Sequence, residues 1–161
     1  MPLTEVVIDG RTWADAKEPR RAEWSSLVRE LLDDNTFSCS DERMRLELGL
    51  SEQLTALDLR SVDSGELVAH AEVSRDALAK HVAEYIDVVR QLSSESLHPA
   101  RVEALDMGKK VVHDNAARAL VRLCRPLGAD HATCRRLFSL LLALRIDTTR
   151  ILGIHGHRPI R

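Results

Sequence analysis

The spacing of apolar residues changes partway along the chain, and this change constrains the fold more than any other feature. Between residues 37 and 73 apolar side chains tend to recur at every second position, a spacing typical of strands with one buried face. After Ser74 they recur every three or four positions, a spacing typical of amphipathic helices. Strands followed by helices predict an α+β fold in which the helices stack on one face of a sheet.

Four strands are expected, at residues 3–8, 43–50, 54–61 and 66–73. The first run ends at Asp9-Gly10, a turn signal, and Asp63-Ser64-Gly65 separates the last two runs as in a hairpin. We therefore expect a small antiparallel β-meander with one solvent-exposed face.

Four helices are expected, at about residues 19–33, 74–92, 99–125 and 131–150. Ser74 is a candidate N-cap, and Pro99 suits a first helical turn. Pro126 and Gly128 should end the third helix. The last helix is apolar over much of its circumference, so we expect it to be the most buried element. The expected fold class is α+β, a small antiparallel β-meander packed against about four α-helices.

The expected organisation is a single compact domain over residues 1–161. Its parts are a strand, helix and meander at 1–73, a helical part at 74–151, and a basic tail at 152–161. With 44% hydrophobic and 30% charged residues, the chain has the composition of a soluble globular protein. No apolar run is long enough to span a membrane and no secretory signal is evident, so we predict a cytoplasmic protein without a membrane partner.

The cysteines give the same indication about the compartment. Cys39, Cys124 and Cys134 are an odd number and show no CxxC or other metal-binding spacing. This pattern predicts reduced, inert thiols in a reducing compartment. A redox pair formed by Cys124 and Cys134 is the alternative.

A strip of ionisable residues is the strongest candidate for a site. Asp106, Lys109, Lys110 and His113 stand at i, i+3, i+4 and i+7 of a predicted helix, so they share one face. One interpretation is an anion-binding or acid–base site in which the lysines supply positive charge and His113, held by Asp106 or Asp114, exchanges a proton. The other is structural: Asp106 pairs with a lysine along the helix, and His113 bonds a neighbouring loop.

Two arginines of the next helix are candidates for the same site. The short turn at Pro126 makes the two helices antiparallel neighbours, so an extended Arg135 or Arg136 should reach toward His113. The candidate binding residues are therefore Asp106, Lys109, Lys110, His113, Arg135 and Arg136.

Three segments carry a resemblance to a known family: residues 31–37, 103–113 and 135–138. Their sequences, in order, are Leu-Leu-Asp-Asp-Asn-Thr-Phe, Glu-Ala-Leu-Asp-Met-Gly-Lys-Lys-Val-Val-His and Arg-Arg-Leu-Phe. Together they resemble the bacterial uncharacterised protein family UPF 0262, a resemblance that covers most of the chain. It implies no particular reaction. The family pattern continues as His-Asn-Glu-Gly where this chain has His113-Asp114-Asn115-Ala116, so no carboxylate at 115 and no glycine at 116 carries over.

Charge is unevenly distributed along the chain. Residues 1–80 carry ten Lys and Arg against seventeen Asp and Glu, whereas residues 100–161 carry twelve against five. Packing of the two halves on each other is the favoured explanation, and a basic face for an anionic partner is the alternative. Arg118, Arg122 and Arg125 form a basic stripe, but the formal net charge of −2 and the lack of a recognition motif argue against nucleic acid.

Cofactors and metals are not expected. The chain has no glycine-rich phosphate loop, dinucleotide fingerprint or nucleophile elbow. His155 and His157 stand near the C-terminus without a third ligand at fixed spacing, so we expect no metal site there.

Two classes of function stay open. The favoured one is a small cytoplasmic, non-enzymatic interaction or regulatory protein whose partner is a protein or a small anion. The alternative is an enzyme or anion-binding protein that uses the strip on the helix 99–125. A concave pocket that joins His113 to Arg135 or Arg136 would favour the alternative, and a flat strip beside an exposed apolar patch would favour the first. The sequence does not determine the oligomeric state.

Overall fold

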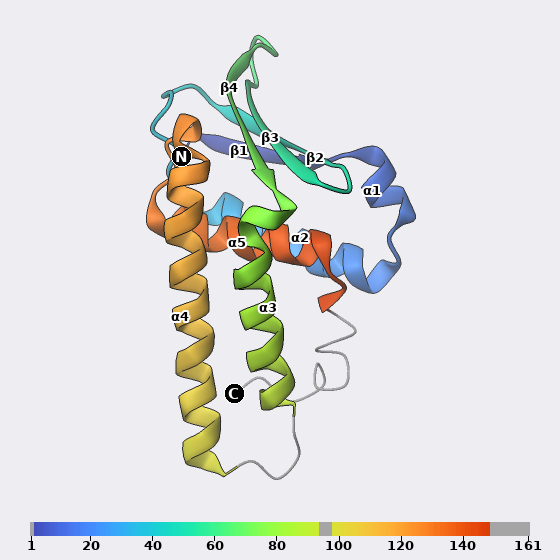
Figure 1. Cartoon of the computed structure of the whole chain (residues 1–161). Coiled ribbons are helices and arrows are strands. Elements are labelled where there is room, and N and C mark those ends of the chain that lie inside the picture. Colours follow the sequence, from blue (N-terminus) through green and yellow to red (C-terminus); the bar gives the residue numbers. More distant parts are fainter. Residues whose placement is uncertain (1, 94–97, 149–161) are drawn as a thin grey trace.

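The computed structural model describes residues 2–93 and 98–148, and these residues form an α+β fold (Figure 1). They contain a four-stranded sheet and five α-helices, with one short 3-10 helix. In chain order the elements are β1 (Leu3–Ile8), α1 (Gly10–Asp15), α2 (Glu18–Asp33), β2 (Met44–Leu50), β3 (Leu54–Ser61), β4 (Leu67–Ser74), α3 (Arg75–Leu92), α4 (Pro99–Leu123), η1 (Arg125–Leu127) and α5 (His131–Arg145).

The sheet is mixed, with the strand order β1-β2-β3-β4. β2, β3 and β4 form the predicted antiparallel meander. β1, however, pairs parallel with β2, with Val6 opposite Leu46, so the prediction of a wholly antiparallel sheet is wrong at this edge. The cause is the connection: α1 and α2 lie between the two strands and return the chain in its original direction, as a parallel pair requires.

The predicted turn at Asp9-Gly10 is instead the start of α1, a helix that was not predicted. One carboxylate oxygen of Asp9 accepts a hydrogen bond from the Thr12 amide at 2.8 Å and thereby caps the helix. The other oxygen accepts from the Thr12 hydroxyl at 2.8 Å and from the Leu50 amide at 2.9 Å. Asp9 therefore ties the first helix to the end of β2, and the structure has five α-helices among its described residues where four were expected.

The two faces of the sheet differ as the alternation predicted. Leu46 of β2 lies opposite Leu59 of β3, and both side chains are buried. On the other face, Glu47 accepts from Arg45 at 3.0 Å and from Arg60 at 2.9 Å. One face therefore belongs to the core, and the other is polar and partly exposed.

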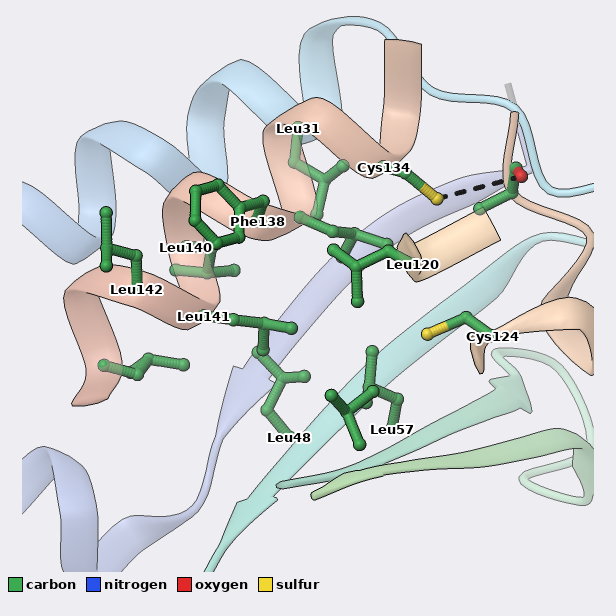
Figure 2. Packing of buried hydrophobic residues seen from close by; sticks show 14 of the residues in the cluster. Leu31, Leu48, Leu57, Leu120, Cys124, Cys134, Phe138, Leu140, Leu141 and Leu142 are labelled. Carbon is green, nitrogen blue, oxygen red and sulfur yellow. Dashed lines mark hydrogen bonds between the residues drawn. The ribbon is translucent and has the colours of Figure 1, made fainter. Parts of the chain in front are cut away.

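α5 is the most buried helix, as predicted. Nine of its fifteen residues are buried, against six of twenty-five in α4. Its Phe138 and Leu141 pack in the same cluster as Leu48 and Leu57 of the sheet and Leu120 of α4 (Figure 2). α5 ends at Arg145, because Ile146 is extended, so the predicted extension to residue 150 is wrong at Ile146 and Asp147. Residues 149–161, including the predicted basic tail, lie outside the described residues.

α3 and α4 lie side by side and extend away from the sheet (Figure 1). Ser74 caps α3 as predicted, by accepting from the Ala77 amide at 3.1 Å. α4 ends at Leu123, two residues before the predicted end, because the chain tightens into η1 at Pro126. Gly128, with φ of 67°, then turns the chain into α5.

All three cysteines are free. Cys39 is exposed, whereas Cys124 and Cys134 are buried, and burial raises the pKa of Cys124 to about 11 and that of Cys134 to about 12. The Cys134 thiol donates to the Ala129 carbonyl at 3.9 Å (Figure 2). The structure therefore contains no Cys124–Cys134 bridge, and the reduced state of the thiols in the cell stays a prediction.

No helix in residues 2–93 and 98–148 combines the length and apolarity that crossing a membrane demands.

Gly128 also allows a close approach of the loop after α2. A Cβ at this position would lie 2.3 Å from Ser38 Oγ and 2.9 Å from the Ser38 amide nitrogen. Gly65 also has a positive φ, 76°, but a Cβ there would meet nothing within 4 Å. Substitution at Gly65 therefore tests backbone strain alone, whereas substitution at Gly128 tests strain together with a steric clash.

We predict that Gly65→Ala lowers the free energy of unfolding by about 1 kcal/mol, the cost of placing a side chain at positive φ. Gly128→Ala should lose a further 1–3 kcal/mol, roughly, because the loop at Ser38 must move. Urea denaturation of both variants measures the difference. Equal losses would contradict the close packing of Gly128 on residues 38–39.

Candidate functional site

The six candidate residues line one open cavity of about 610 Å³. α4 contributes four of them and α5 two, and α2 closes a third side through Leu27 and Glu30. Ala132 and Ser139 of α5 complete the lining. The strip is therefore part of a concave site rather than a flat surface. The six residues are Asp106, Lys109, Lys110, His113, Arg135 and Arg136.

The packing of α4 explains why the strip faces this cavity. The helix buries Val112, Ala116 and Leu120 against the core, and α5 packs beside it. The strip lies beside this buried face, so it borders the seam between the two helices. Lys110 is exposed at this seam, while Lys109 is half-buried with its ammonium 5.9 Å from the centre of the Tyr85 ring.

His113 is held between two aromatic rings. Its ring centre lies 5.4 Å from that of Tyr85 and 5.4 Å from that of Phe138, both in edge-to-face geometry. Its Nδ1 lies 3.0 Å from the Lys109 carbonyl oxygen, which can only accept, so Nδ1 carries the proton. The other ring nitrogen, Nε2, then carries a lone pair 3.3 Å from the Ser139 hydroxyl, whose single hydrogen is shared between this nitrogen and the Arg135 carbonyl at 3.4 Å.

Burial lowers the pKa of His113 below its usual value. The positive charges of Arg135 and Lys109 act in the same direction, and the Lys109 carbonyl and the Asp114 carboxylate oppose them. His113 is therefore a neutral imidazole at neutral pH, with the lone pair of Nε2 directed at Ser139.

The two arginines are positioned by carboxylates that do not line the cavity. Asp114 accepts from Arg135 and also lies 3.2 Å from His131 Nε2. Those hydrogen bonds, His131 first, lower the pKa of Asp114, so it is ionised at neutral pH. Arg136 donates to Asp34 of the chain after α2 at 3.2 Å. Each guanidinium has five donor hydrogens, so these contacts orient both groups and leave donors available.

Two predicted interactions within the strip do not occur. His113 was expected to be held by Asp106 or Asp114, but its partner is the carbonyl of Lys109, one turn earlier on the same helix. The structural interpretation expected an ion pair of Asp106 with a lysine, and no such pair occurs in residues 2–93 and 98–148. The strip therefore does not neutralise itself along the helix.

Sequence reasoning missed Ser139 and Glu30. Ser139 follows Arg135 and Arg136 by four and three residues, so helical spacing could have placed it on their face. Glu30 comes from α2, and the sequence contains no signal that α2 packs against α5.

Basic side chains outnumber carboxylates four to two in the cavity lining, beside one neutral imidazole. This arrangement can bind an anion. His113 Nε2 can also accept a proton from a ligand once its hydrogen bond with Ser139 is broken. The described residues contain no group of three side chains that could hold a metal ion.

We predict that wild-type protein loses more stability than the His113→Phe variant between about pH 7 and pH 5. The pKa of His113 is lower in the folded than in the unfolded state, where it is about 6.5. As the pH falls through that value the unfolded chain takes up a proton first, so the stabilisation present above it is lost. Phe keeps the aromatic packing and removes the titration.

Urea denaturation of both proteins across this pH range measures the difference. His70 has the opposite effect, because hydrogen bonds to Asp58 and Glu72 raise its pKa, but both proteins share it. Parallel pH dependence of the two proteins would contradict a buried, neutral His113.

Comparison with known proteins gives one consistent result. The model of the Uncharacterised protein family (UPF0262) matches residues 1–147. The chain is 30% identical to a UPF0262 protein of Azorhizobium caulinodans, over 84% of this chain and 85% of the relative. It is 29% identical to one of Rhodospirillum rubrum and 27% identical to one of Methylobacterium radiotolerans, each over 88% of this chain and 91% of the relative. No solved structure matches the chain. The chain therefore belongs to the uncharacterised protein family UPF0262, as the resemblance of its three segments predicted.

Proposed function

We propose that the protein binds a small anion, a phosphate or carboxylate group, in the cavity between α4 and α5. One observation carries this proposal: four basic side chains from two helices converge on one concave site that holds only two carboxylates. A basic excess in a concave site concentrates anions from solution, because the low-dielectric walls focus the field.

The four basic groups would act in two ways. Lys110 is exposed at the cavity and makes no ion pair with another described residue, so its ammonium can approach an anion as a point charge. Arg135 and Arg136 are oriented by Asp114 and Asp34, and their remaining donors suit the paired oxygens of a carboxylate or phosphate. The site is thus partly preorganised before any ligand enters.

The carboxylates of Asp106 and Glu30 limit the charge of the ligand. They leave an excess of two positive charges in the lining, which Asp114 and Asp34 offset from outside it through their ion pairs with Arg135 and Arg136, so the site suits a small anion better than a polyanion. Nucleic acid fits this cavity poorly for the same reason, and the chain offers few aromatic side chains for stacking.

A second candidate is the non-enzymatic interaction protein favoured by the sequence. Met107 and Val111, one turn apart on α4, are 56% and 53% exposed although both are large and apolar. They flank Lys110 in sequence, so a protein partner that carries an acidic or phosphorylated side chain could use both features. An enzymatic role would instead require a proton transfer at His113 Nε2, which Ser139 occupies here.

We also infer that residues 1–161 form a single domain and that the protein is cytoplasmic. One hydrophobic cluster joins the sheet to α2, α3, α4 and α5, which supports the first inference. Three free cysteines support the second.

We predict that Lys110→Gln weakens the binding of inorganic phosphate by about tenfold, since a charge-assisted contact contributes about 1.5–3 kcal/mol. Lys80→Gln makes the same change at an exposed position of α3 outside the cavity, and it should leave binding unchanged. Isothermal titration calorimetry measures both, and thermal unfolding should show that neither variant loses stability. Equal weakening by both variants, or no phosphate binding to wild-type protein, would contradict the site and favour the second candidate.

A further inference from the structure

A second cavity, of about 320 Å³, lies where the beginning of α3 meets the end of α5. Thr55, near the beginning of β3, and Val73, near the end of β4, also line it. It shares no lining residue with the cavity between α4 and α5. A ligand of this second cavity would therefore bind independently of an anion between α4 and α5.

Most of the residues that line this cavity are apolar. Leu78, Val82 and Ile86 recur every four residues along α3, so they form one face of the helix. Phe138 and Leu141 of α5 contribute further apolar lining. Because Val82 and Ile86 are only half-buried, apolar surface in the cavity stays uncovered by the described residues.

Two arginines, Arg75 and Arg145, also line the same cavity. Arg145 is half-buried and donates to the Ser51 carbonyl at 2.5 Å and to the Thr55 hydroxyl at 2.9 Å. Burial, and the charge of Arg75 close by, lower the pKa of Arg145. No ion pair among the described residues involves either arginine. Two neighbouring cations without a carboxylate partner favour an anionic group beside them.

We propose that this cavity binds a straight-chain monocarboxylic acid of medium length. The carboxylate lies against Arg75 and Arg145, whose planar guanidinium groups match its two oxygens. The hydrocarbon chain lies between α3 and α5, where it covers the exposed parts of Val82 and Ile86. A volume of 320 Å³ stands at the lower end of small-molecule sites, about 300–1,000 Å³, which selects a medium chain over a membrane lipid.

The test is titration of the whole protein with decanoate below its critical micelle concentration, followed by calorimetry. Decanol has the chain without the charge, and acetate has the charge without the chain. We expect decanoate to bind, and decanol and acetate to bind at least about tenfold more weakly. Equal binding of decanoate and decanol would overturn the role of the arginines, and no binding of decanoate would overturn the proposal.

Two variants locate the binding. Arg75→Gln removes the exposed arginine and should weaken decanoate binding about tenfold, whereas Arg90→Gln, an exposed arginine of α3 outside the cavity, should have no effect. Ala79→Phe fills the cavity from an exposed position of α3 and should abolish binding. Ala77→Phe makes the same change nearby, outside the lining, and should retain it.

Arg145 is left intact in these variants because its bonds to residues 51 and 55 are structural. Phosphate binding at the other cavity should be unchanged in all four variants. Decanoate binding that survives Ala79→Phe, or that falls equally in Arg75→Gln and Arg90→Gln, would overturn the assignment.

Discussion

Burial of α5 is the constraint on which the rest of the structure depends. Its first turn is fixed by Asp130, which accepts from the Thr133 amide at 2.9 Å, and by Thr133 itself, whose hydroxyl accepts from the Thr36 amide at 2.8 Å. Its last turn is fixed by Trp24, whose indole donates to the Ala143 carbonyl at 2.9 Å. A helix held at both ends and buried along most of its length leaves one narrow polar face. That face carries the two arginines and Ser139, so the same element organises the core and one wall of the cavity.

His113 connects the core to the charged cavity. Its ring fills the space between Tyr85 of α3 and Phe138 of α5, and both of its nitrogens have hydrogen-bond partners. Burial holds the imidazole neutral, and the nearby cations Arg135 and Lys109 act in the same direction. An anion that entered the cavity would offset those cations and favour the protonated form. Under the proposed function, anion binding would therefore raise the pKa of His113, a residue that also packs against α3 and α5.

Local patterns predicted the parts of this structure that depend on local physics. Clean alternation predicted a strand at 43–50, within one residue of β2, and the less regular run at 54–61 matches β3. The side chain of Ser74 caps α3 as its position indicated. The strip and the two arginines were placed at one site because helical spacing and a short turn determine which faces meet. The direction of β1 and the existence of α1 were missed for a different reason. A six-residue helix is too short to show a period, and it is held by Asp9 through the amide of Leu50, far along the chain. A contact between residues so far apart in the chain produces no periodic pattern in the local sequence, so it cannot be predicted from that pattern.

The most direct test of the anion site is the location of amide chemical-shift changes in two-dimensional NMR spectra during a phosphate titration. Phosphate held between α4 and α5 should shift the amides of residues 106–113 and 132–139 together, with one common saturation curve. Shifts spread over the other basic surfaces, such as residues 118–125 of the chain, or an absence of saturation, would contradict the account.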